Sequence, residues 1–282
     1  MSHIVTAWES EGEGMHTSIE KVMAKMASGA MPLGSHIAFD SPFVTEMLAG
    51  CGFDMMWIDA EHGALDKKDI QLHLLACRAA GVAGIVRVPW NDFVFIKGVL
   101  DMGADGIVVP FVRNLEEAKL AVAATTYPPE GVRGLGLRRA LNYGLGDRAD
   151  YLANANKKIW TLIQIEHIDA VKDLDAIMQL PGVSGIVVGP QDFSMSMCYP
   201  GRSFTPADPE AIEQYDKIGE IASKYNKPFG VSGAYSEQFV KDWVGRGVNF
   251  MFLNFEFHLV VNGGKAIISN THKVLDELGK RH

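Results

Sequence analysis

Short apolar runs rich in β-branched residues recur along the chain and are separated by stretches with helical periodicity. Apolar runs with few interior polar residues are typical of parallel strands that are covered on both faces. The runs predict strands at Ser35–Phe39, Met55–Asp59, Gly84–Val88, Gly106–Phe111, Ile159–Ile165, Gly185–Val188, Lys227–Val231 and Asn249–Phe255.

Amphipathic stretches fill the intervals between these runs and predict helices. Ahead of the first run, Thr17 and Glu20 match a capping box, which predicts a helix from there to about Ser28. The other helices are predicted at Pro42–Ala49, Lys67–Ala80, Asp92–Met102, Leu115–Ala124, His167–Gln179, Pro209–Tyr225, Ser236–Gly245 and, closing the chain, Lys265–Leu278.

Strands that alternate with helices indicate βαβ units and a parallel sheet. Eight such units within about 250 residues favour a single-domain (β/α)8 TIM barrel over residues 1–282. A loose segment of about residues 1–16 would precede the barrel, and an extra C-terminal helix of about residues 264–280 would follow it. A doubly wound sheet is the main alternative, but the turn after the first strand reads Asp40-Ser-Pro where a dinucleotide fold favours GxGxxG.

Two long interruptions, Tyr127–Asn156 and Met195–Ala207, stand out from the short connections elsewhere. Loops of this length inside a compact domain are commonly functional. We therefore expect both to be active-site loops.

Composition narrows the class of protein. The chain has 282 residues with 26 Lys and Arg against 34 Asp and Glu, a net charge of −8, which argues against a nucleic-acid partner. Its most apolar stretch, Phe250–Val261, includes Asn254, Glu256 and His258, so we expect a buried strand and its loop rather than a membrane span. Three scattered cysteines and an N-terminus without a signal-peptide pattern predict a cytoplasmic protein.

Carboxylates follow two neighbouring predicted strands. In a barrel the carboxyl ends of all strands meet at the catalytic face, so Glu166 and Asp192 would project from adjacent strands. Two carboxylates with water and a chelating ligand form a hard oxygen site for Mg²⁺, Mn²⁺ or Co²⁺. The alternative is that each carboxylate caps the helix that follows it.

A histidine and an arginine occupy the same rim. His62, close after Asp59 and Glu61 at the end of the second strand, is a candidate general base, or else a hydrogen-bonded rim histidine. Arg87 lies in an apolar strand, where an unpaired charge is costly. It would hold a carboxylate or an enolate at the barrel mouth, or form an ion pair with Glu61 or Glu166.

Lysine is missing from the carboxyl ends of the predicted strands, and Lys227 begins a strand at the opposite rim. Schiff-base catalysis needs a lysine at the active face. The pattern therefore favours metal-assisted carbanion chemistry.

Five motifs in order resemble the HpcH/HpaI aldolase family of class II, metal-dependent pyruvate aldolases, which includes 4-hydroxy-2-oxoheptanedioate aldolase. They are Trp57-Ile-Asp-Ala-Glu-His62, Val86-Arg-Val-Pro-Trp-Asn91, Tyr127-Pro-Pro-Glu-Gly-Val-Arg-Gly134, Gln164-Ile-Glu166 and Val188-Gly-Pro-Gln-Asp192. The resemblance spans about residues 30–262 and implies a TIM barrel, arranged as a hexamer of three dimers that exchange a C-terminal helix.

The resemblance also implies roles for single residues. His62 would be the base, Asp101 would support its basicity, and Arg87 would stabilise the enolate. Glu166 and Asp192 would bind the divalent metal ion, and Gln164 and the backbone of Gln191 would contact the substrate. The expected reaction is reversible cleavage of a 4-hydroxy-2-oxo acid to pyruvate, or a close 2-oxo acid, and an aldehyde.

The chain departs from the family at two places, Gln191, where a small residue is common, and the loop Leu137–Gly146. These departures leave the aldehyde open. Two alternatives stay beside the aldolase: a CoA-ester lyase of the malyl-CoA or citrate-lyase β type, and a catalytically silent barrel that binds small acids. The first would need a basic surface for the nucleotide, and no basic run is evident in the sequence.

Overall fold

The computed structural model describes residues 18–136 and 138–281. Within them, all strands run parallel and close into a barrel in chain order, with the last strand pairing with the first. The strands are β1 (Leu33–Ile37), β2 (Met55–Asp59), β3 (Ala83–Arg87), β4 (Gly106–Val109), β5 (Trp160–Ile165), β6 (Gly185–Val188), β7 (Phe229–Gly233) and β8 (Phe250–Phe255).

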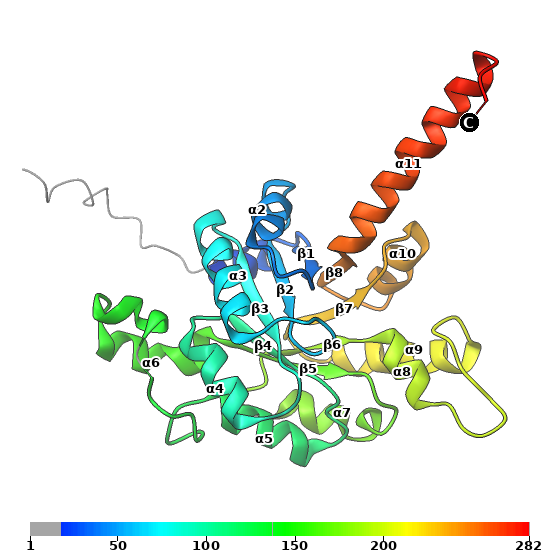
Figure 1. Ribbon diagram of the computed structural model, residues 1–282. Coiled ribbons are helices and arrows are strands. Elements are labelled where there is room, and N and C mark those ends of the chain that lie inside the picture. The colour runs from blue at the N-terminus through cyan, green and yellow to red at the C-terminus, as the bar shows by residue number, and fades with distance from the viewer. Residues whose placement is uncertain (1–17, 137, 282) are drawn as a thin grey trace, which may run out of the picture.

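Helices surround this barrel (Figure 1). They are α1 (Ser18–Ala27), α2 (Pro42–Gly50), α3 (Lys67–Ala80), α4 (Phe93–Asp101), α5 (Leu115–Thr125), α6 (Arg148–Lys158), α7 (Ala170–Gln179), α8 (Pro190–Ser196), α9 (Pro209–Ala222), α10 (Glu237–Gly245) and α11 (Glu256–Glu277), with a short 3₁₀ segment, η1 (Arg139–Gly144). The chain therefore folds as the predicted (β/α)8 TIM barrel with an extra C-terminal helix. In the described residues, no helix is long and apolar enough to cross a membrane.

Two apolar layers hold the barrel together. The outer layer lies between strands and helices, and the inner layer fills the barrel with large side chains such as Trp57, Trp160 and Phe252. Ile19 and Val22 of α1 belong to the inner layer, so α1 closes the N-terminal end of the barrel. This packing leaves the opposite end, where the strands finish, for polar side chains.

Side chains that accept backbone N–H groups begin several of the helices. Asp66 and Asp69 form the reciprocal cap of α3, and Asp92 accepts the Phe95 N–H at 2.7 Å at the start of α4. The cap predicted for α1 involves Thr17, which lies outside the described residues, whereas α1 itself is present.

The structure corrects one of the two predictions about the loops. Residues 126–136 and 138–159 join α5 to β5 and contain η1 and α6, so they lie at the N-terminal end of the strands and do not form a mouth loop of this chain. The segment that follows α8 does lie on the mouth side, because it leads into the start of α9. The reason is topological: only connections that leave a strand for a helix reach the catalytic face.

The last helix also differs from the prediction. The loop expected after β8 does not form, because α11 begins at Glu256 directly after the strand. From there α11 extends away from the barrel (Figure 1), and of its residues Glu256 alone is buried.

Candidate active site

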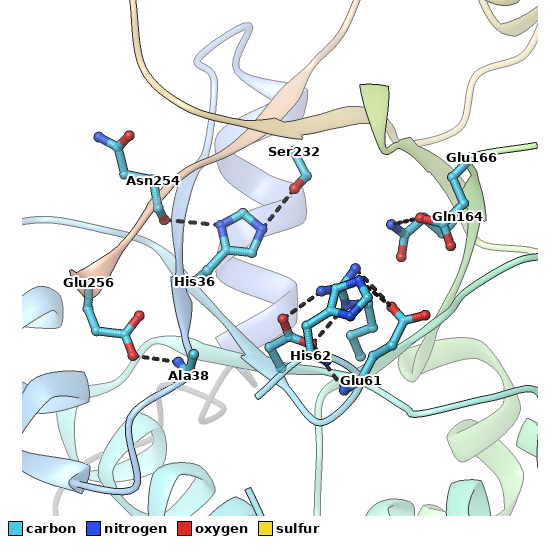
Figure 2. Close-up of polar contacts among 11 residues, drawn as sticks. His36, Ala38, Glu61, His62, Gln164, Glu166, Ser232, Asn254 and Glu256 are labelled. Carbon is cyan, nitrogen blue, oxygen red and sulfur yellow. Dashed lines mark hydrogen bonds and ion pairs between the residues drawn. The ribbon is translucent and has the colours of Figure 1, made fainter. Parts of the chain in front are cut away.

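Four polar side chains point into the barrel where β2, β3 and β5 end. Asp59, Arg87, Gln164 and Glu166 are all buried, with between 0% and 4% of their surface exposed. Their strands place them there by alternation: the inner layer below them includes Trp57, Ile85 and Leu162, two residues earlier on the same strands. The barrel mouth is thus polar at the bottom and walled by the strand ends (Figure 2).

Arg87 is held by two carboxylates. Its Nε lies 2.9 Å from Asp59 Oδ1 and its Nη2 lies 2.5 Å from Asp59 Oδ2, a bidentate pair. Its Nη1 lies 2.9 Å from Glu61 Oε2. Burial by itself would lower the pKa of Arg87. The hydrogen bonds and charge of Asp59, together with the charge of Glu61, outweigh burial and raise the pKa of Arg87. The ion pair with Glu61 that the sequence offered as an alternative role is therefore present, while Glu166 makes no ion pair with Arg87 within 4 Å in the described residues.

Glu166 is a buried carboxylate with two donors. Its Oε1 accepts the N–H of Phe111 at 2.8 Å, and its Oε2 accepts Gln164 Nε2 at 2.5 Å. Burial, with repulsion from Glu61 and Asp192, raises the pKa of Glu166 to about 8. The carboxylate does not cap α7, which begins at Ala170, so the helix-cap alternative fails for this residue.

Gly189 leaves room beside Glu166. A Cβ added at this position would lie 2.8 Å from Gln164 Nε2 and 3.0 Å from Glu166 Oε2, closer than side chains tolerate without a shift. A glycine is therefore needed at the end of β6 for the Gln164–Glu166 pair to keep its place.

Asp192 and Gln191 follow β6 in the first turn of α8. Asp192 is half-buried and Gln191 is exposed. The Asp192 carboxylate makes no cap hydrogen bond with α8, and its charge contributes to the raised pKa of both Glu61 and Glu166. The fold thus brings Glu166 and Asp192, 26 positions apart in the sequence, to one side of the mouth.

The donor set suits a divalent cation. Repulsion from Asp192 contributes to the raised pKa of Glu61 and of Glu166, Glu61 also raises the pKa of Glu166, and Arg87 is the cation among them. The Oε1 atom of Gln164 is buried without a hydrogen-bond partner. In the described residues no cluster of three or more His, Cys, Asp and Glu side chains could hold a metal ion, so a cation held by Glu166 and Asp192 would need further oxygens from water or substrate.

His62 lies at the solvent edge of the site. Its side chain is 57% exposed, and its Nε2 is 3.9 Å from Glu61 Oε2. Its backbone N–H donates to Asp59 Oδ1 at 3.2 Å, so the residue that orients Arg87 also fixes the loop that carries His62. Figure 2 shows the imidazole of His62 beside the side chain of Glu61.

Asp101 does not join this group within the chain. It ends α4, near the N-terminal end of the strands, where its Oδ1 lies 3.5 Å from Arg133 Nη2. The resemblance placed it behind His62, but a helix that starts at the mouth ends at the opposite face, so one chain cannot bring the two together.

The sequence pointed to most of these residues, and the structure adds others. The sequence predicts Glu61 as a possible partner of Arg87, whereas the bidentate pair of Arg87 with Asp59 appears only in the fold. The sequence predicts that Phe111 ends a strand. In the structure β4 ends at Val109, and the φ of 52° at Phe111 turns its N–H toward Glu166. Strand alternation could have found Asp59, because Trp57 and Asp59 must share a face.

A parallel barrel with a buried arginine and carboxylates at its C-terminal mouth has the arrangement of a TIM-barrel enzyme site. A sequence model of the HpcH/HpaI aldolase/citrate lyase family matches residues 33–227. The 5-keto-4-deoxy-D-glucarate aldolase of Escherichia coli strain K12 is 39% identical over 211 residues, which cover 75% of this chain and 81% of that protein.

Solved structures agree with this match. An HpcH/HpaI aldolase from Desulfitobacterium hafniense DCB-2 has a TM-score of 0.78 at 26% identity, over 93% of this chain and 97% of that chain. Citrate synthase SbnG has a TM-score of 0.78 at 27% identity, over 90% of this chain and 98% of that chain. The chain belongs to the HpcH/HpaI aldolase/citrate lyase family and is an enzyme of the aldolase and lyase class.

Proposed function

We propose that this enzyme is a class II aldolase that reversibly cleaves a 4-hydroxy-2-oxo acid to pyruvate, or a close 2-oxo acid, and an aldehyde. One observation carries the proposal: the buried Gln164–Glu166 pair lies beside Arg87 at a mouth with surplus carboxylate. The similarity to 5-keto-4-deoxy-D-glucarate aldolase of Escherichia coli favours a hydroxylated substrate of this class.

Glu166 and Asp192 would hold a divalent cation, Mg²⁺, Mn²⁺ or Co²⁺. When bound, the ion would act as a Lewis acid on the keto and carboxylate oxygens of the 2-oxo acid. The raised pKa of Glu166 fits this role, because a cation would relieve the repulsion that its carboxylate feels from Glu61 and Asp192. Gln164 would keep the Glu166 carboxylate oriented through its 2.5 Å hydrogen bond.

The chain's own side chains would move the proton and hold the charge. His62, at the solvent edge, would take the proton of the 4-hydroxyl, and the electrons of the breaking C3–C4 bond would pass to the 2-oxo acid as an enolate. Arg87, fixed by Asp59 and Glu61, would face the enolate oxygen as that charge develops. Protonation of the enolate at C3 then gives pyruvate.

The chain is expected to work as a homo-oligomer, as a hexamer of three dimers. Large apolar side chains are exposed along α11, among them Val260, Ile267 and Ile268. An amphipathic helix this long is not stable unless it buries its apolar face. We propose that α11 packs on a neighbouring copy of this chain.

The test is metal-dependent release of pyruvate from a 2-oxo-4-hydroxy acid. Protein treated with EDTA should be inactive, and Mg²⁺, Mn²⁺ or Co²⁺ should restore cleavage. A panel of aldehydes offered with pyruvate in the reverse direction then identifies the electrophile. Full activity after exhaustive chelation would refute the metal role.

The two alternatives give different results in the same assay. A CoA-ester lyase would require a thioester substrate, and a silent barrel would release no pyruvate with any of the metals. The charge cluster of Arg87, Asp59 and Glu61 argues against a silent barrel, since burying it without a role is costly.

A further inference from the structure

A second polar group lies in the barrel mouth, on the strands β1, β7 and β8. His36 of β1 places its Nε2 at 2.8 Å from the Oγ of Ser232 on β7, and its Nδ1 at 3.1 Å from the backbone oxygen of Asn254 on β8. The imidazole is buried and stacks on Phe255 at 4.4 Å, whereas Ser232 is half-buried. Figure 2 shows the three residues as one connected group.

The hydrogen-bond partners determine which atoms donate. A backbone carbonyl accepts only, so the Nδ1 of His36 must carry the hydrogen that goes to Asn254. Burial lowers the pKa of His36 to about 4, so the ring is neutral and its Nε2 is a bare acceptor. The hydrogen of the Ser232 hydroxyl is therefore directed to His36, and the oxygen of Ser232 can offer nothing but lone pairs to the mouth.

The sheet register places this oxygen beside the proposed 2-oxo acid site. Val188 of β6 pairs with Val231 of β7, so the next residues, Gly189 and Ser232, are neighbours. The position of a Gly189 Cβ would touch both Gln164 and Glu166. A side chain at Gly189 would collide with the Gln164–Glu166 pair, so no side chain at this position separates Ser232 from that pair.

We propose that Ser232 is a specificity-determining residue that accepts a hydrogen bond from a hydroxyl on C3 of the 2-oxo acid, with His36 as its positioning residue. The inference rests on the proposed function, which places the carboxylate and keto group of that acid at Glu166 and Arg87. In the proposed orientation the reacting C4 lies near the exposed His62 that follows β2, and C3 points toward β7. A 3-hydroxy-2-oxo acid, of which hydroxypyruvate is the simplest, then binds better than pyruvate.

Calorimetric titration of both acids with Mn²⁺ in excess tests this preference. In the wild-type enzyme, we expect the Kd of hydroxypyruvate to be about fivefold lower than that of pyruvate, the effect of one neutral hydrogen bond. Ser232→Ala should bring the ratio of the two constants close to one by weakening hydroxypyruvate binding and leaving pyruvate binding in place. Ser232→Cys keeps the size of the side chain with a poor acceptor, and it should behave in the same way.

Ser35→Ala is the matched control. Ser35 is a buried serine on the same strand as His36, and its Oγ also donates to the Asn254 oxygen, at 3.2 Å. It is offset by one residue from His36, so its side chain faces away from the mouth. This variant should keep the wild-type ratio.

Each outcome decides between the two proposals. Equal wild-type binding of both acids, or a ratio that survives in Ser232→Ala and Ser232→Cys, overturns the role of Ser232 while the aldolase stands. Failure of the wild-type enzyme to bind pyruvate at all refutes the proposed function and this inference with it. Nitrogen-15 NMR spectra of the histidines give a further check. His36 should show a protonated Nδ1 and an unprotonated Nε2, and the Nε2 signal should shift in Ser232→Ala. The opposite tautomer would overturn the argument.

Discussion

Single residues at the barrel mouth take their charge state from close neighbours. Asp59 is as buried as Glu166, yet burial raises the pKa of Glu166, whereas at Asp59 the hydrogen bonds and charge of Arg87 outweigh burial and lower the pKa. The two carboxylates differ because one has a bidentate cation and the other has acidic neighbours. Asp59 therefore holds Arg87 in place, whereas the described residues give Glu166 no ion pair within 4 Å.

Arg87→Lys separates catalysis from structure. A lysine keeps the charge that Asp59 needs, but it lacks the planar fork that holds two oxygens at once. We expect kcat for aldol cleavage to fall by about 10² or more, as when one donor to a developing oxyanion is removed. Pyruvate proton exchange, which needs the same enolate, should fall in parallel, while the melting temperature changes little.

The control for this variant is Arg87→Ala, which leaves Asp59 buried without a cation. It should lower the free energy of unfolding by about 3–5 kcal/mol, measured by urea denaturation. A lysine variant that keeps most of its activity would show that Arg87 is an ion-pair partner and not part of the enolate site.

Asp105 predicts a pH dependence that is independent of the active site. It lies before β4, accepts the Gly84 N–H at 2.9 Å, and burial raises its pKa from 3.8 to about 6. Between these values the folded chain holds a proton that the unfolded chain has released, so the free energy of unfolding falls as pH rises from about 4 to 6.

Comparison with Asp105→Asn isolates this contribution. An asparagine can still accept from Gly84 and does not titrate. From pH 4 to pH 7 the wild-type protein should lose roughly 2 kcal/mol of stability relative to this variant, measured by urea denaturation at each pH. Parallel stability curves for the two proteins would contradict the raised pKa.

The helices differ in how much of their apolar surface the chain itself buries. Most barrel helices bury an apolar face against the strands, as α7 does with Val171, Leu174 and Ile177. The last helix, α11, extends past the barrel with its apolar side chains exposed (Figure 1). This exposure is the reason for the proposal that α11 packs on another copy of the chain.

Ile268→Asp tests that surface. Ile268 is 57% exposed in the single chain, so the substitution should cost an isolated subunit little. Light scattering coupled to size exclusion should show the wild-type protein as an oligomer and the variant shifted toward smaller species. Asn270→Asp, which adds the same charge at an exposed polar position of α11, is the control and should leave the assembly intact. A wild-type monomer at micromolar concentration would refute the packing of α11 on another copy.

At the scale of the whole molecule, barrel closure gathers the site. Arg87 and Glu166 are 79 positions apart, and β3 and β5, which only β4 separates in the ring, bring them to one mouth. A cation held by Glu166 and Asp192, as proposed, would tie the end of β5 to the start of α8. Binding to the folded chain alone stabilises it by mass action.

Adding Mn²⁺ to EDTA-treated protein should therefore raise the melting temperature, by about 5 °C at a hundredfold excess over Kd. Glu166→Gln and Asp192→Asn should each lose most of that shift, because each removes one of the two proposed ligands. Differential scanning fluorimetry measures all three proteins. An equal shift in the wild type and both variants would place the ion elsewhere.

The sequence by itself determined the barrel. Apolar runs alternating with amphipathic helices allow few arrangements other than βαβ units, and eight of them close a ring. It also indicated the polar rim, because residues such as Arg87 and Glu166 end apolar strands whose carboxyl ends must meet.

Tertiary structure decided the pairing of those residues. Which acid Arg87 contacts depends on strand register and shear, which no local pattern encodes, so Asp59 became its bidentate partner. The same register brought His36 and Ser232 together across β1 and β7. Asp101 and residues 126–136 and 138–159 lie at the opposite end of the barrel. Each lies at or beyond the end of a helix that starts at the mouth and runs the length of the barrel, so its side chains cannot reach the mouth of the same chain.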